Sequence, residues 1–347
     1  MPLPFIPILV GAVAVGTGAY GAKKGYDAYQ DNESANWANN RANETIENAK
    51  KLIDTHRKAS GKALENLGAK KLFVLDNVVK SLIDTIEKIN LKDSIGLQEL
   101  SKFKIDKNQF VELKEMSGFA SSMLGGTAAG AMGGALTAFG AYGAAGWLAT
   151  ASTGTAISTL SGAAATNATL AFFGGGSLAA GGLGVAGGTA VLGGLVAGPA
   201  LAVIGFIASE KASALKDEAY ANLSKAEKYA QELKTASVAC DGVRRRADMF
   251  YRFFVRLESL AMPINYELSK IVEKYKNPDT GKADPAKFDE KERKIFGASI
   301  SVIKTIKTLL DTPLLTERGE LTEQSELVAT QIDEQVNLAE KQVANEL

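Results

Sequence analysis

Residues 32–91 read NESANWANNRANETIENAKKLIDTHRKASGKALENLGAKKLFVLDNVVKSLIDTIEKINL, and this stretch decides the fold class. Apolar and small residues recur along it, mostly every three or four positions: Ala35, Ala38, Ala42, Ile46, Ala49, Ile53, Ala63, Leu67, Leu72, Leu75, Val79, Leu82, Ile86 and Ile89. Such spacing puts them on one side of an α-helix, as in the narrow apolar seam of a coiled coil. The stretch contains no proline. We therefore expect one long helix, which at about 1.5 Å per residue would reach roughly 90 Å.

His56 and Ser60 occupy two positions of the same seam, and His56 is the only histidine of the chain. A histidine there is either a pH-sensitive group or a polar residue that sets the register of packing, and we favour the second interpretation. Cys240 is the only cysteine, which excludes an internal disulfide. The sequence offers no catalytic constellation, metal-ligand cluster or cofactor motif, so we expect a protein that is not an enzyme.

Charge is distributed very unevenly along the chain. The 39 basic and 39 acidic residues all lie outside Met116–Ser209, a stretch of 94 residues that holds 23 of the 35 glycines. The overall balance of charge argues against binding to nucleic acid. In water, each glycine within a helix costs about 1 kcal/mol relative to alanine. In a bilayer, small residues let helices pack closely, so a lipid bilayer is the expected partner.

Glycines spaced four residues apart within this stretch form a glycine zipper pattern. The candidate helix-packing residues are Gly126, Gly130, Gly134, Gly184, Gly188, Gly194 and Gly198. Since one membrane crossing needs about 20 residues, the stretch has room for two to four crossings. Three states stay open: permanent residence in a membrane, a switch from water to membrane, and a buried core in water. A Gly-x-Gly-x-x-Gly pattern at residues 182–187 lacks the strand before it that a dinucleotide site requires.

The pattern of charge divides the chain into four regions. Residues 1–25 form an apolar helix that could anchor the chain, and the lysines at its end favour the cytoplasmic side. Residues 26–115 form the long amphipathic helical region, residues 116–209 the uncharged membrane region, and residues 210–347 a C-terminal helical region. In this last region we expect a turn-rich loop over 275–288 and helices over 290–310 and 321–344.

Residues 243–262, VRRRADMFYRFFVRLESLAM, combine basic and aromatic side chains. Arg245, Arg252 and Arg256 share one helix face, while Phe250 and Phe253 lie on another. One interpretation is a helix lying on an anionic lipid surface. The other is a helix packed into a core, with its arginines solvated or paired with acids such as Glu218 or Glu227.

Two quoted stretches resemble a bacterial family. GAYGAKKGYDAY (residues 18–29) and ATLAFFGGGSLAAGGLGVAGGTAVLGGLVAGPALAVIGFI (residues 168–207) are similar to a largely uncharacterised group of Gly/Ala-rich helical proteins, sometimes labelled chemotaxis proteins. The resemblance covers about residues 10–260 and implies no activity. In layout the chain is also similar to apolipoprotein-L-like and colicin-type proteins, which insert a hydrophobic hairpin into bilayers.

These observations lead to two functional hypotheses for an all-α protein with a transmembrane or membrane-inserting hairpin region. The first is a membrane-embedded homo-oligomer that forms a pore or perturbs the bilayer, as a toxin or an immunity effector does. The alternative is a membrane scaffold or adaptor that anchors through the Gly/Ala hairpin and recruits a protein partner through its long helices. The expected location is a bacterial inner membrane, with the charged regions on the cytoplasmic side.

Overall fold

The protein is all-α. The computed structural model describes residues 20–90, 107–124, 136–137, 139–141, 216–316 and 319–346, and these residues form helices and isolated bridges but no strand. The described residues divide into two compact units. The smaller unit contains residues 20–51 and 216–233, and the larger unit contains the rest. Both long helices, α1 (Tyr20–Phe73) and α9 (Lys216–Lys274), contribute to both units.

The smaller unit is held together by small side chains. Its core joins α1 to α9 and consists of Ala35, Ala38, Ala42, Ala219, Leu223 and Ala226, with Ile46 packed against it. Alanine at these positions lets two helices approach closely. The rings of Trp37 and Tyr220 lie beside this core, with their centroids 6.4 Å apart.

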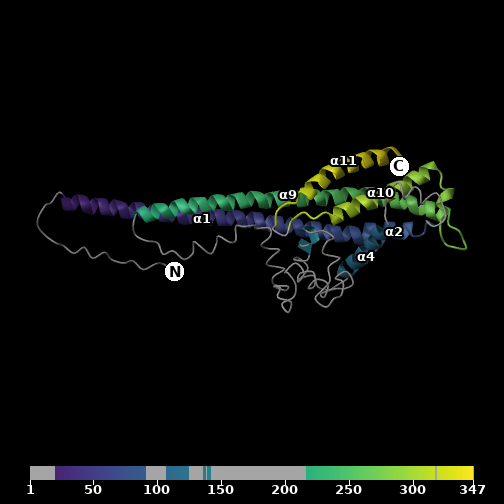
Figure 1. The fold of residues 1–347 in the computed structure, drawn as a ribbon, viewed down its shortest axis with the longest axis horizontal. Helices are drawn as coiled ribbons and strands as arrows, with labels where there is room; N and C mark the ends of the chain where they lie inside the picture. The colour runs from purple at the N-terminus through teal and green to yellow at the C-terminus, as the bar shows by residue number, and fades with distance from the viewer. Residues whose placement is uncertain are drawn as a thin grey trace. The chain divides into compact units, whose positions relative to one another are not determined.

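In the larger unit, α1 and α9 run in the same direction (Figure 1). Two polar contacts join them, Ser60 with Cys240 and Lys70 with Glu258. A third, between Ser81 and Asn265, follows in the same order beyond the end of α1. The helix predicted over residues 32–91 is confirmed as far as Ile86, and its seam residues are buried except Ile46, which is partly buried. The predicted seam of α1 therefore packs against α9 of the same chain.

The first helical stretch changes its winding midway. The π-helix η1 (Val74–Val79) follows α1 and leads into α2 (Lys80–Ile86). Against it packs α4 (Lys107–Leu124), whose Ser117 hydroxyl donates to the Leu75 carbonyl at 2.8 Å. The Ser121 hydroxyl on the same helix donates to the Asp76 carboxylate. These contacts fix α4 on the side of η1.

The C-terminal helices are close to the predicted ones. α10 (Glu290–Asp311) begins with a capping box, in which Asp289 and Glu292 each accept the other's backbone N–H at 2.8 Å. The loop before it is confirmed and contains the short 3-10 helix η6 (Pro285–Lys287). The Asn90 N–H donates to the Ala283 carbonyl at 2.8 Å, which ties this loop to the end of the first helical stretch. α11 (Glu323–Glu346) follows after residue 322.

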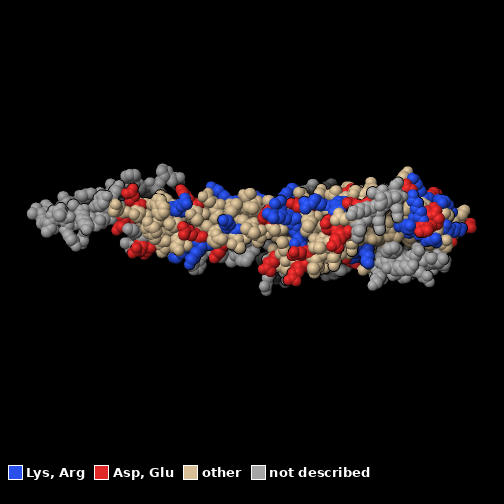
Figure 2. Space-filling model, turned by 90° about the horizontal axis from the view of Figure 1, so that it is seen from above, with Lys and Arg blue, Asp and Glu red and all other residues tan. Residues whose placement is uncertain are grey.

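Charged side chains are widely distributed over the described surface (Figure 2). Acidic and basic side chains are interspersed over the face shown in Figure 2. Within the described residues, no helix has both the length and the apolar character that a membrane crossing demands. The apolar helix predicted over residues 1–25 lies almost entirely outside the described residues, as does most of the uncharged stretch.

The packed seam predicts a difference between two leucines of α1 in the larger unit. Leu67 is fully buried, so Leu67→Ala should leave a cavity and lower the free energy of unfolding by about 2–5 kcal/mol. Leu52 is 40% exposed, and Leu52→Ala should cost less than about 1 kcal/mol. Urea denaturation followed by circular dichroism measures both changes. Equal losses for the two variants would show that the seam does not pack as described.

Candidate functional site

The seven glycines predicted to pack helices in a membrane, Gly126, Gly130, Gly134, Gly184, Gly188, Gly194 and Gly198, lie outside the described residues. Two parts of the uncharged stretch are described. One is the end of α4, and the other is a short piece comprising residues 136, 137 and 139–141, which we call the docked segment. It belongs to the larger unit, where it contacts α1 and the chain after α10.

Two glycines bring the docked segment into direct contact with the backbone of α1. A Cβ atom added to Gly68 would lie 1.9 Å from the Leu136 carbonyl oxygen, and one added to Gly140 would lie 2.0 Å from the Leu64 carbonyl oxygen. No side chain fits at either distance, so both positions require glycine. The close approach is of the kind that small residues permit between helices.

Lys71 holds the docked segment by its main chain. The Lys71 Nζ atom is buried and donates to the carbonyl oxygens of Phe139 and Gly140, at 3.1 and 3.2 Å. The backbone N–H groups of Leu314 and Leu315 donate to the Ala141 carbonyl at 2.7 and 3.2 Å. Three successive carbonyl groups of the docked segment are therefore satisfied by groups of the helical body.

Two opposing effects set the pKa of the Lys71 side chain. Burial lowers the pKa of Lys71 from 10.5 to about 7, and the nearby Asp311 carboxylate opposes this change. Asp311 accepts from the Lys307 ammonium at 2.6 Å, and Lys307 also pairs with Glu112 at 3.1 Å. Burial raises the pKa of Asp311, against the attraction of Lys307. Four ionisable groups from α1, α4 and α10 thus form one cluster beside the docked segment.

This arrangement is suited to binding a neutral piece of chain. A lysine with a pKa near 7 changes its charge within the physiological range. Both its charged and its neutral form can donate to carbonyl groups while the side chain is buried.

Within the residues that the structure describes, no group of histidine, cysteine, aspartate and glutamate has the arrangement of a metal site.

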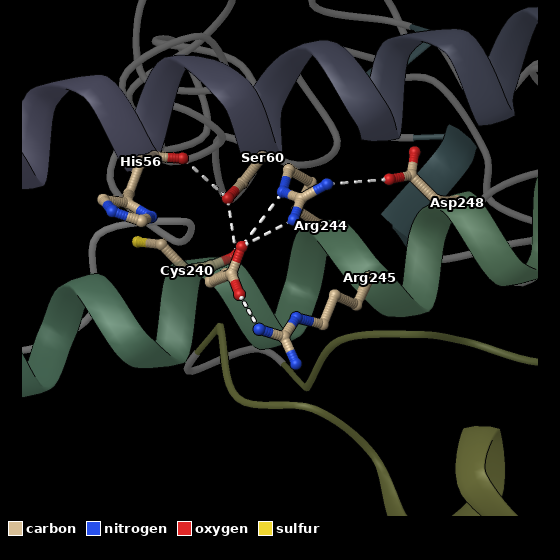
Figure 3. Close-up of polar contacts among 7 residues, drawn as sticks. His56, Ser60, Cys240, Arg244, Arg245 and Asp248 are labelled. Carbon is tan, nitrogen blue, oxygen red and sulfur yellow. Dashed lines mark hydrogen bonds and ion pairs between the residues drawn. The ribbon is translucent and has the colours of Figure 1, made fainter.

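The only histidine and the only cysteine lie near each other where α1 meets α9, with Ser60 between the two backbones (Figure 3). The buried Ser60 hydroxyl lies 2.6 Å from the Cys240 carbonyl oxygen and 2.8 Å from that of His56. Burial raises the pKa of the Cys240 thiol, against the effect of Arg57, so the thiol stays protonated. The Ser60 hydroxyl contacts carbonyl oxygens of both helices. Neither Ser60 nor Cys240 is therefore activated as a nucleophile. This arrangement agrees with the interpretation in which the polar residues of the seam set the register of packing between helices.

The proposed lipid-facing pair of phenylalanines faces the protein interior. Phe250 and Phe253 are both buried, and their rings pack at a centroid distance of 6.1 Å. In this structure they offer no surface to lipid, because α9 uses that face for its core. This part of α9 is therefore a helix packed into a core, which was the second of the two interpretations of its sequence.

The three candidate arginines differ in their surroundings. Arg245 pairs with Asp241 at 2.7 Å, and Arg256 binds both Glu340 and Asp333, at 2.8 and 3.0 Å. The Glu340 carboxylate raises the pKa of Arg256. Arg252 is exposed and forms no ion pair with the described acids. The acids named from the sequence, Glu218 and Glu227, are therefore not the partners of these arginines.

The contact made by Lys71 and Gly68 was missed by sequence reasoning. A signal was available, because the three-and-four spacing breaks between Leu67 and Leu72. Position 71 lies four residues after Leu67 and thus on the seam, where a lysine is unexpected. Nothing in the sequence indicated which segment Lys71 would meet.

Comparisons with protein-family models, with curated proteins and with solved structures give no match.

The glycine contact predicts opposite effects for two alanine substitutions on α1. Gly68→Ala should detach the docked segment, because the new Cβ would overlap the Leu136 carbonyl. The N–H groups of Leu314 and Leu315 would then lose their acceptor, and their hydrogen exchange should become faster. Gly61→Ala is the control, because no atom lies within 4 Å of its added Cβ. It should stabilise the helix by up to about 1 kcal/mol and leave that exchange unchanged. Unchanged exchange in Gly68→Ala would contradict the contact.

The buried lysine predicts how stability varies with pH. The folded state holds fewer protons than the unfolded chain between pH 7 and 10.5, so the free energy of unfolding should rise with pH across this window. Below about pH 7 the full cost of burying the charge is present. Lys71→Met should flatten this rise, as urea denaturation at several pH values would measure. Lys114→Met, at an exposed position paired with Glu87, should leave the slope unchanged. A slope retained in Lys71→Met would contradict the assignment.

Proposed function

We propose that the protein associates with membranes, with its uncharged stretch entering the bilayer while its charged helices remain in water. The observation that carries this proposal is the run of 94 residues without a charged side chain between two charged regions. Small neutral residues at four-residue spacing favour helix packing in lipid over exposure to water. The first hypothesis, an oligomer that perturbs the bilayer, follows from this.

The character of the described helices supports the second half of the proposal. Several of their ion pairs join two exposed side chains, such as Arg41 with Glu44 and Lys51 with Glu47. Such pairs contribute little to stability but keep a surface hydrated. A body of this kind is fitted to stay outside the bilayer.

The docked segment supports a switch from water to membrane. A piece of the uncharged stretch rests on the helical body through two glycine contacts and a few main-chain hydrogen bonds. Protonation of Lys71 makes its burial more costly, so a lower pH favours release of the segment. The negative potential of an anionic membrane surface attracts protons and acts in the same direction.

One observation favours the scaffold or adaptor as a second candidate. Four exposed apolar residues recur on α9 within the larger unit: Tyr251, Val255, Met262 and Tyr266. Their spacing of four, seven and four places them along one stripe of the helix. An exposed stripe of this kind is a feature of helices that recruit protein partners.

Vesicle binding tests the proposal. The purified chain is mixed with phosphatidylcholine vesicles that contain a fluorescent dye, and flotation and dye release are measured together. We expect flotation that resists carbonate. Release of dye favours the pore, and flotation without release favours the scaffold. A chain that stays monomeric and does not float would refute both.

A substitution within the uncharged stretch tests the role of its glycines. Gly188→Leu raises hydrophobicity but blocks close helix packing, so it should reduce oligomer formation in the membrane while preserving flotation. Gly61→Leu is the matched control, since that position on α1 has open space around an added Cβ. Crosslinking in vesicles measures assembly. If both variants assemble like the original chain, the glycine packing face is wrong.

A further inference from the structure

The exposed apolar stripe of α9 has the same pattern when it is followed in either direction. A tyrosine stands at each end, Tyr251 and Tyr266, and a non-aromatic apolar side chain, Val255 or Met262, lies four residues inside each tyrosine. The spacings along the stripe are therefore four, seven and four. The pattern is unchanged when the helix is turned end for end about its midpoint, which lies between positions 258 and 259.

Charged residues extend this pattern beyond both tyrosines, with opposite signs at the two ends. Arg244 lies seven residues before the first tyrosine, and Glu273 lies seven residues after the second. At 3.6 residues per turn, both fall on the side of α9 that carries the stripe. Asp248 and Lys270 lie about one turn inside them, again with opposite signs. Each end of the stripe is therefore complementary in charge to the other end.

These features point to a second copy of the chain as the molecule that covers the stripe. We propose that α9 pairs with α9 of another copy in antiparallel orientation, about a two-fold axis at the midpoint of the stripe. A two-fold interface brings one surface against itself, so the surface must match its own reverse. The axis sets Tyr251 against the partner's Tyr266. It also sets Val255 against the partner's Met262, and all four side chains are exposed in the single chain.

The charged residues meet opposite charges across the same pairing. Arg244 comes level with the partner's Glu273, since the two lie equally far from the axis. Asp248 comes within one residue of the level of the partner's Lys270. The symmetry repeats both pairs at the other end of the interface. Complementary charges of this kind favour the antiparallel direction over the parallel one, in which like charges would meet.

The four groups already have partners within the chain, but they stay open to solvent. Their side chains are 39–72% exposed. The pairs within the chain are Arg244 with Asp241 and Asp248, Lys270 with Glu267, and Glu273 with Lys276. Ion pairs between groups at the surface contribute little to stability, so these side chains can turn towards a second copy at small cost.

The midpoint of the stripe carries no uncompensated charge. Glu258 lies next to the axis and pairs with the Lys70 ammonium of α1, and the two side chains are only 24% and 13% exposed. The glutamates of two copies can therefore approach each other there. Lys70 also lies over the Phe73 ring, with Nζ 4.9 Å from the centroid, and Phe73 is 42% exposed. Phe73 thus adds apolar surface beside the midpoint.

A dimer of this kind deepens the scaffold candidate of the proposed function, on which it rests, because it names the protein that α9 recruits. It forms in water and needs no lipid. It is also distinct from assembly through the glycines of the uncharged stretch, because its contacts come from α9.

Single cysteines test the position of the axis. In a Cys240→Ser background, Ser259→Cys places a thiol next to the axis, so mild oxidation should link two chains through it. Ser269→Cys is the matched control, since both serines are exposed and donate to the carbonyl three residues earlier. The axis sets the two Ser269 positions about 30 Å apart, so this variant should give at least about tenfold less linked dimer.

Sedimentation equilibrium without lipid measures the association itself. Met262→Glu should raise the dissociation constant of the dimer about tenfold or more, because it places a charge in the packed stripe. Leu327→Glu is the control and should leave the constant unchanged. Leu327 belongs to α11, and it is 65% exposed where Met262 is 63% exposed, so neither substitution disturbs a core. Circular dichroism checks that every variant is folded.

The outcomes decide between the ways of pairing. Linked dimer from Ser259→Cys alone, together with weaker association of Met262→Glu, supports the antiparallel dimer. Equal linking through both cysteines would mean a parallel dimer and would overturn the proposal, as would a chain that stays monomeric. If Met262→Glu and Leu327→Glu associate alike, the stripe is not the interface. Vesicle flotation tests the membrane proposal separately, so either proposal can fail while the other stands.

Discussion

The parallel pairing of α1 with α9 is the constraint on which the larger unit depends. Ser60 meets Cys240 and Lys70 meets Glu258, so residues that pair are separated by 180 or more positions. Two parallel helices cannot be joined by a short turn, since the chain must first return to the end at which both begin. The long uncharged stretch lies within this connection. Its attachment beside Lys71 therefore fixes one point of the return path on the surface of the paired helices.

Much of the fold could be predicted from the sequence, because it follows from spacing along a helix. Ala38, Leu67 and Leu82 are buried, as their periodic positions indicate. The capped start of α10 and the loop before it are also local features, encoded by residues such as Asp289 and Pro285. The direction of pairing is not local. An apolar seam does not specify whether its partner runs parallel or antiparallel, or whether that partner belongs to the same chain.

The candidate site was harder to predict, because it depends on contacts between distant residues. Gly68 and Lys71 lie in a sequence that is otherwise an ordinary amphipathic helix, and only the docked segment gives them a role. The arginines of α9 could be located, but their different charge balances depend on acids of α11, such as Asp333 and Glu340. Phe253 shows the same limit, because an aromatic residue on a helix face looks alike whether lipid or protein covers it.

The distance along the chain between Ser60 and Cys240 also affects how the protein is made. A ribosome adds about 5–20 residues per second, so the 180 residues between this pair take roughly 10–40 s to synthesise. During that time the seam of α1 has emerged without the partner that covers it. The uncharged stretch emerges in the same interval. Until α9 is complete, the apolar seam of a nascent chain of this kind stays uncovered, and an uncovered apolar seam is prone to aggregation.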